Sequence, residues 1–300
     1  MWFLAVYLWE AAQEELLKAN APIITEYRLY VLVYEMIQRG LVEILPIKRF
    51  PRAWDRMQCR RLLRKLERED VLVPDEDFAA GVWIVVQSTR AASAEDACCL
   101  VDPFAYVSHL SAMQLYGLTD RAPAALHLTV PAPKLWAEMR NERIARDLGS
   151  NTSLIDASPL NRVSLAGSAV RRRPVRVHTT SHPVTPTPLA DGFARVAPIG
   201  HVFAGMLAEP ELYGGIRHAI EVWEASAEPW LDDIIAAVDQ QPRKLAKVRA
   251  GYVLSELMDV RDERVDAWRA FAQRGGSQKL DPEAPYVPRW SDGWMLSLNT

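Results

Sequence analysis

The chain has 300 residues, of which 49% are hydrophobic and 24% charged, and its formal net charge is −3. This composition is typical of a globular protein with a buried core and excludes an intrinsically disordered one. Three cysteines, two of them adjacent (Cys98 and Cys99), provide neither a disulfide framework nor a metal-binding spacing. We therefore expect a cytoplasmic protein with two domains, or one large one, and with no metal or other cofactor.

The first nineteen residues predict a helix whose start is apolar. Residues 1–9 are almost wholly apolar, but they lack the basic segment and the cleavage site of a secretion signal, and they are too short to span a bilayer. We expect this helix to pack on its own domain or on a second copy, with no membrane partner.

A second helix is expected after Thr25, which suits an N-cap, and before Gly40, which suits a C-cap. Between them, apolar side chains recur at helical spacing: Leu29, Leu32, Val33, Met36 and Ile37.

Residues 55–69 predict a strongly basic amphipathic helix. One stripe is apolar (Cys59, Leu62, Leu63, Leu66), and the other side carries Arg56, Arg60, Arg61, Arg64, Lys65 and Arg68. From Lys48 to Arg68 there are nine Lys or Arg and two acidic residues, which gives +7 within a chain of −3. The positive charge is therefore concentrated here.

Two short strands, 71–74 and 82–86, follow this helix around a polar turn. Two helices and a hairpin in this order predict a winged helix-turn-helix domain over residues 1–90, with the basic helix contacting DNA. Asp75, Glu76 and Asp77 at the hairpin tip would be repelled by phosphate, so we expect the hairpin to stay out of the groove. Arg56 and Arg60, near the helix start, are expected to approach base edges.

Residues 90–96 are small and polar and predict a linker. The remainder, 91–300, predicts a larger mixed α/β domain, so the fold class is α+β. We expect helices at 108–116, 134–148, 199–208, 216–225 and 241–258, and strands at 126–130, after the basic turn at 171–178, and at 290–298.

Several blocks of this second domain resemble the AbiEi family, the antitoxins of abortive-infection type IV toxin–antitoxin systems. The blocks are residues 102–119 (DPFAYVSHLSAMQLYGLT), 126–131 (LHLTVP), 171–178 (RRRPVRVH), 209–216 (EPELYGGI) and 277–282 (SQKLDP). Their order, together with the expected winged helix, extends the resemblance over about residues 20–300.

The resemblance implies a fold and a function. AbiEi-like proteins join a winged helix-turn-helix to a larger domain, bind inverted repeats in their own promoter, repress the operon and counteract a nucleotidyltransferase toxin without requiring a stable complex with it. We expect a monomer in solution, with two copies on DNA. The implied DNA-binding residues are Arg52, Arg56, Arg60, Arg61, Arg64, Lys65 and Arg68, joined in the second domain by Arg171, Arg172, Arg173 and Arg176. Relatives often carry an acidic residue where this chain has Gly205, so the resemblance implies no chemistry of that acid here.

Two other classes of protein remain open. A restriction-endonuclease-like enzyme would need an Asp and a Glu-x-Lys set around a divalent metal. Neither this spacing nor a phosphate loop, a His/Cys cluster or a Ser-His-Asp set is evident, and the six histidines are scattered, so we expect no enzyme activity. The other class is a module that sequesters the toxin by direct contact through its many tryptophans (Trp136, Trp223, Trp230, Trp268, Trp290, Trp294), although tryptophans at this density mostly fill a core.

Overall fold

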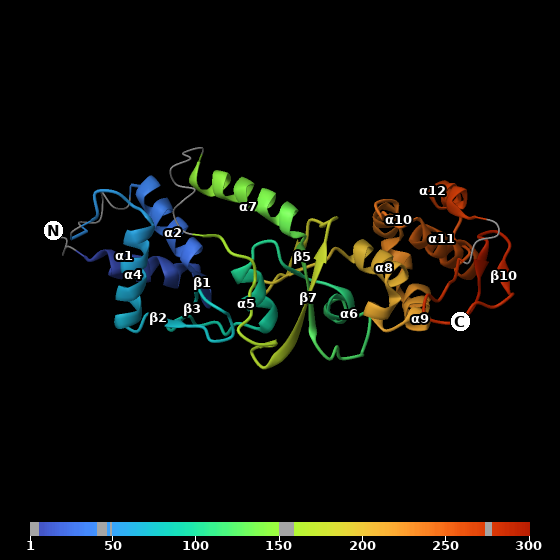
Figure 1. The fold of residues 1–300 in the computed structure, drawn as a ribbon, viewed down its shortest axis with the longest axis horizontal. Helices are drawn as coiled ribbons and strands as arrows, with labels where there is room; N and C mark the ends of the chain where they lie inside the picture. The colour runs from blue at the N-terminus through green and yellow to red at the C-terminus, as the bar shows by residue number, and fades with distance from the viewer. Residues whose placement is uncertain (1–5, 41–46, 49, 150–158, 274–277) are drawn as a thin grey trace. The chain divides into compact units, whose positions relative to one another are not determined.

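A computed structural model describes residues 6–40, 47–48, 50–149, 159–273 and 278–300. The chain forms two compact units. The N-terminal unit comprises 1–106, 129–183 and 188–195, and the C-terminal unit comprises 107–128, 184–187 and 196–300. The fold is α+β, as the sequence predicts, with the N-terminal helices and strands drawn in blue in Figure 1. The predicted boundary at residue 90 falls inside the first unit.

The N-terminal unit contains α1 (Leu8–Ala19), β1 (Ile23–Thr25), α2 (Glu26–Gln38), α4 (Arg56–Arg68), β2 (Leu72–Pro74), β3 (Val82–Val85), α5 (Ala94–Val101), α7 (Pro133–Leu148), β6 (Ala169–Val170) and β7 (Arg173–Thr180). The start of α1 at Leu8 agrees with the predicted first helix for the part that is described, and residues 1–5 lie outside the described residues. Within the described ranges, no helix has the length and apolar character needed to cross a membrane.

Helices α2 and α4 begin where their caps predict. The hydroxyl of Thr25 accepts a hydrogen bond from the backbone N–H of Arg28 at 3.2 Å, and the carboxylate of Asp55 accepts one from Gln58 N–H at 2.8 Å. Each cap satisfies one of the backbone donors left unpaired in a helix's first turn. Gly40, just after α2, has a φ of +67°, which favours glycine and ends the helix.

A three-stranded antiparallel sheet in the order β1-β3-β2 lies beside these helices. Ile24 pairs with Trp83, and Val73 pairs with Ile84. The core of the unit joins the buried faces of α1, α2 and α4 to α7, with Tyr30 and Leu66 fully buried and Trp136 4% exposed. The hairpin therefore rests on the same core as the basic helix.

Four expected elements differ from those observed. The basic segment 171–178, expected as a turn before a strand, is mostly strand, because β7 begins at Arg173. Residues 94–96 are not linker, because Ser93 caps α5 and Asp96 is buried, where it accepts hydrogen bonds from the N–H groups of Phe193 and Ala194. The predicted strand 290–298 is instead a two-stranded hairpin. The predicted helix 241–258 begins at Lys244 and changes at Val253 to a π-helix.

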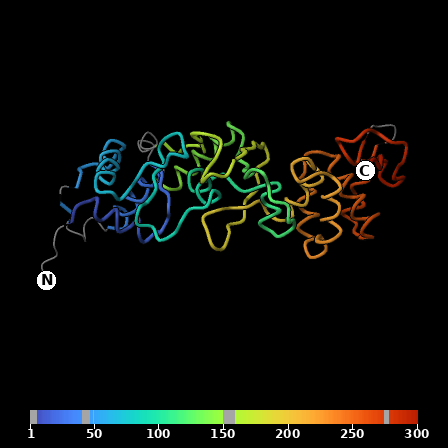
Figure 2. The backbone as a smooth tube through the Cα atoms, turned by 90° about the horizontal axis from the view of Figure 1, so that it is seen from below, coloured from blue at the N-terminus to red at the C-terminus, as the bar shows by residue number. Residues whose placement is uncertain are grey.

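The C-terminal unit is mainly helical, and Figure 2 follows its helices from residue 199 onward in colours from yellow to red. It contains α6 (His109–Leu115), α8 (Ile199–Ala208), α9 (Ile216–Ser226), α10 (Leu231–Asp239), α11 (Lys244–Tyr252), α12 (Glu263–Ala267), β10 (Trp290–Ser291) and β11 (Leu296–Ser297). The remaining strands are β4 (Tyr106–Val107), β5 (Leu126–Pro131), β8 (Thr187–Pro188) and β9 (Arg195–Val196), in a six-stranded sheet of order β6-β7-β5-β4-β9-β8.

Candidate nucleic-acid interface

Helix α4 has the two faces that its sequence predicts. The four residues of the apolar stripe, Cys59, Leu62, Leu63 and Leu66, are at most 5% exposed. Arg60, Arg61, Arg64 and Arg68 are exposed around the opposite side, and Arg52 is exposed just before the helix. The arginine side chains that could meet an anion therefore lie on the surface away from the core.

A carboxylate that the sequence analysis missed borders this face. Glu26, in the first turn of α2, is 9% exposed, and its Oε1 accepts hydrogen bonds from Nε of Arg56 at 3.2 Å and Nε of Arg60 at 3.4 Å. These bonds fix both arginines at one edge of the face while using only Nε. The terminal nitrogens are the atoms that grip phosphate or guanine. The sequence marks Glu26 only as an acidic residue in the first turn of a helix. Such residues are common there because they interact favourably with the helix dipole, so this position does not indicate a partner for arginines.

The far end of α4 is tied to its neighbours. Lys65 forms an ion pair with Glu69, Arg68 Nε donates to the backbone oxygen of Arg64 at 3.1 Å, and the carboxylate of Glu67 accepts a hydrogen bond from Trp83 Nε1 at 2.7 Å. The last contact joins β3 to α4 and fixes the hairpin against the helix.

The acidic tip of the hairpin is not an exposed negative patch. Asp75 is buried, and Arg171 forms ion pairs with both Asp75 and Asp77. Backbone hydrogen bonds join the same loop to a later segment, from Ala79 N–H to Ser164 O at 2.9 Å and from Ala166 N–H to Asp77 O at 3.0 Å. Two of the three tip acids are thus held by Arg171 and the loop is joined to residues 164–171, whereas Glu76 stays exposed. Packing therefore constrains the tip, and the expectation that the hairpin stays out of a DNA groove remains a prediction.

The four arginines expected to bind DNA at 171–176 divide into two pairs. Arg171 is held by the hairpin acids, and Arg173 forms an ion pair with Glu95. Arg172, in the turn between β6 and β7, and Arg176, on β7, are exposed. The exposed pair is better placed for a phosphate, whereas the other two have structural partners.

In the C-terminal unit, two of the histidines that were expected to be scattered lie together. The rings of His109 and His127 are 5.7 Å apart between centroids, and Ser108 Oγ lies 2.7 Å from His109 Nδ1. His109 Nε2 is 3.8 Å from Glu209, whose carboxylate also forms an ion pair with Arg243 at 2.9 Å. Ser108 is 4% exposed, so its hydroxyl serves as a buried hydrogen-bond partner of the imidazole.

Gly205 has a steric explanation. A Cβ at this position would lie 2.1 Å from the hydroxyl oxygen of Tyr213, which is 6% exposed. The ring of Tyr213 therefore occupies the space that an acidic side chain would need, so the chain cannot carry that acid without moving Tyr213.

Comparisons with known proteins include a structural likeness at low sequence identity. No protein-family model and no curated protein matches the chain. Among solved structures, it is similar to the crystal structure of the Rv2827c protein from Mycobacterium tuberculosis, with a TM-score of 0.48 and 13% identity over 97% of this chain and 91% of that one.

Proposed function

We propose that the chain is a DNA-binding antitoxin of the AbiEi type, which represses its own operon and counteracts a nucleotidyltransferase toxin. The resemblance of the sequence blocks supports the antitoxin part. The cationic face of α4 supports the DNA-binding part, and it is the observation on which the proposal mainly depends.

In this proposal, residues 8–86 form a winged helix-turn-helix. The order α1, β1, α2, α4, β2, β3, with β1 completing an antiparallel sheet on β3, is the order of elements in such domains. Helix α4 then takes the place of the recognition helix, which in helix-turn-helix proteins lies in the major groove. The hairpin would support α4 and would not enter a groove itself, because Arg171 holds Asp75 and Asp77 of its tip.

Binding would be driven by phosphate contacts of the exposed arginines, with base-edge contacts from the helix start. Two copies would occupy the two halves of an inverted repeat and exclude RNA polymerase from the promoter. Arg172 and Arg176 would add phosphate contacts from β7.

The test is a gel-shift titration of the purified protein on its own upstream promoter fragment, at two salt concentrations, against unrelated DNA of equal length. We expect promoter-preferring binding that weakens as salt rises. Equal affinity for both fragments would contradict the repressor, and an affinity independent of salt would contradict the role of the cationic face.

A second candidate is direct sequestration of a protein toxin by the C-terminal unit. Of the six tryptophans considered above, Trp136, Trp223, Trp268 and Trp294 are buried, so they fill cores as expected. Trp230 and Trp290 are 41% and 39% exposed, and the ring of Trp290 lies 5.3 Å from that of Tyr286, which is 44% exposed. Exposed aromatic pairs are common anchors of protein interfaces. Stable co-purification with the neighbouring toxin would favour this candidate, and independent migration would oppose it.

A further inference from the structure

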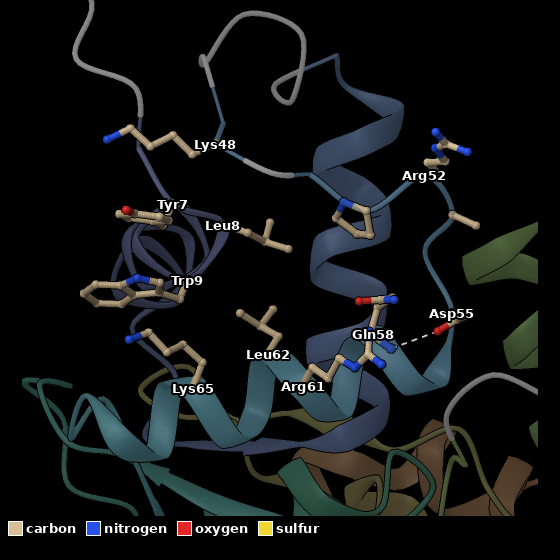
Figure 3. A pocket seen from close by; sticks show the side chains of 12 residues that line it. Tyr7, Leu8, Trp9, Lys48, Arg52, Asp55, Gln58, Arg61, Leu62 and Lys65 are labelled. Carbon is tan, nitrogen blue, oxygen red and sulfur yellow. Dashed lines mark hydrogen bonds between the residues drawn. The ribbon is translucent and has the colours of Figure 1, made fainter.

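A hollow of about 610 Å³ lies on the flank of α4, beside the start of α1, Lys48 and residues 51–55 (Figure 3). Its walls are aromatic and cationic, and its floor is apolar, with Leu62 and Leu8 pointing into it. The 50–55 segment is held in place by Trp54, whose Nε1 donates to Tyr30 O at 3.1 Å and whose ring stacks on that of Tyr30. The hollow is therefore formed by anchored elements.

Two aromatic rings form one wall. Figure 3 shows Tyr7 and Trp9 on the same side, with Lys48 beyond one ring and Lys65 beyond the other. The Nζ atoms lie 5.0 Å from the Tyr7 ring centroid for Lys48 and 5.4 Å from the Trp9 ring centroid for Lys65. Both distances are within the range of cation–π attraction, which orients lysine and ring together.

The lining is strongly positive. It includes Lys48, Arg52, Arg61 and Lys65 against a single acid, Asp55, whose carboxylate already caps α4. Lys65 has Glu69 as an ion-pair partner, but no carboxylate in the described part of the chain lies within ion-pairing distance of Lys48, Arg52 or Arg61. Three cations without a matching acid favour an anionic occupant.

We propose that this hollow binds a nucleoside phosphate. The volume falls within the range of sites that enclose small molecules. A base would contact the Tyr7–Trp9 wall and the apolar floor, while the phosphate would take hydrogen bonds from Arg61 and the neighbouring cations. An inorganic anion would contact only the charged side chains and would make no contact with the Tyr7–Trp9 wall.

Occupancy has a consequence that depends on the proposed function. Arg52, Arg61 and Lys65 belong both to the hollow and to the proposed DNA-binding face, so a bound nucleotide would withdraw three cations from phosphate contacts. The nucleotide would then compete with DNA and act as a small-molecule release signal.

The test is calorimetric titration of the full chain, without DNA, using adenosine 5′-monophosphate (AMP), adenosine and inorganic phosphate as separate probes. We expect AMP to bind at least about tenfold more tightly than either fragment, because it alone engages both the charges and the wall. Lys48→Gln should weaken AMP binding by about tenfold, as expected for loss of a charged contact. Tyr7→Leu, at a side chain that is 46% exposed, should weaken AMP but not phosphate.

Lys134→Gln is the matched control, since Lys134 is an exposed lysine on α7 outside the hollow. AMP binding no tighter than phosphate binding, or unchanged in both Lys48→Gln and Tyr7→Leu, would overturn the proposal. A promoter gel shift without nucleotide tests the proposed function separately. If the protein binds AMP but shows no promoter preference, nucleotide binding in the hollow would be supported. Only the proposed competition between nucleotide and DNA would be rejected.

Discussion

The guanidinium of Arg171 and the carboxylate of Asp75 face each other through two parallel hydrogen bonds, Nη1 to Oδ1 at 3.0 Å and Nη2 to Oδ2 at 2.6 Å. The residues are 96 positions apart, and the side chain of Asp75 is only 1% exposed. The hydrogen bonds that Arg171 donates to the Asp75 carboxylate raise the pKa of the arginine, so Arg171 stays charged at any physiological pH. This pair attaches the hairpin to the β6–β7 turn.

Arg171→Ala is expected to destabilise the protein by about 3 kcal/mol, because it leaves the Asp75 carboxylate buried without its cation. Urea unfolding followed by circular dichroism would measure the loss. The control is Arg172→Ala, next along the chain in the same left-handed backbone conformation but exposed, which should change the free energy of unfolding by less than about 0.5 kcal/mol. Equal losses in the two variants would show that the ion pair is unimportant.

The double variant Arg60→Ala/Arg64→Ala is expected to weaken DNA binding with little loss of stability. Both side chains lie outside the buried stripe, and Glu26 keeps Arg56 as an ion-pair partner when Arg60 is removed. If about six phosphates are neutralised, the slope of log K against log salt should be roughly −5 for the wild type, and it should fall in magnitude by about 2 in the double variant. Salt-dependent fluorescence anisotropy on promoter DNA would measure both slopes.

The matched control for this double variant is Lys134→Ala/Arg261→Ala, which removes two exposed cations elsewhere. It should leave the slope unchanged. An unaltered affinity in the Arg60/Arg64 variant would reject α4 as the DNA-contacting helix.

The helices of the N-terminal unit could be predicted from the sequence because their signals are local. The stripe of α4 and its Asp55 cap lie within a few residues, and the observed helix differs from the predicted one by one residue at each end. The final hairpin was predicted as one strand, although the pair Asp292-Gly293 between its two strands is a strong turn signal that the prediction missed.

The partners of the charged residues could not be predicted in this way. Glu26 lies 30 and 34 positions from Arg56 and Arg60, and only the packing of α2 on α4 brings it to them. The hollow likewise depends on where the start of α1 lies against α4. Ion pairs between residues far apart in the chain leave no periodic pattern in the sequence. The charge count therefore predicts a cationic face but does not show which of its arginines form ion pairs with acids elsewhere.

Glu26→Gln is expected to reduce discrimination between promoter and unrelated DNA. The carboxylate holds Arg56 and Arg60 in one orientation, so its loss should free them for any phosphate and raise the affinity for unrelated DNA by several-fold, through removal of one negative charge. Competitive anisotropy with both DNAs would give the ratio of affinities.

Glu35→Gln is the control for this change, because Glu35 lies on the same helix, has a side chain that is 45% exposed and pairs with Arg28 rather than with α4. It should leave the ratio unchanged. A Glu26→Gln protein with wild-type discrimination would mean that the two arginines do not depend on this carboxylate.

Asp102 provides a pH dependence of stability whose sign can be worked out. It is fully buried and accepts hydrogen bonds from Trp136 Nε1 at 3.1 Å, Phe104 N–H at 3.0 Å and Val163 N–H at 3.1 Å. Burial raises its pKa above the usual 3.8 despite these donors, so the folded state holds the proton more tightly than the unfolded state does. The stability that this residue contributes is therefore full below pH 3.8 and is lost as the pH rises through the raised folded pKa.

Asp102→Asn isolates this effect from the other carboxylates, because asparagine does not titrate. The free energy of unfolding of the wild type minus that of Asp102→Asn should fall as the pH rises from about 4, with a slope of at most about 1.4 kcal/mol per pH unit for one proton. The asparagine NH₂ group can also meet the three donors unfavourably. This would change the difference in free energy of unfolding by the same amount at every pH and leave its slope unaltered. Urea unfolding of both proteins across the range would measure it, and a difference that stays constant or rises with pH would contradict a raised pKa at Asp102.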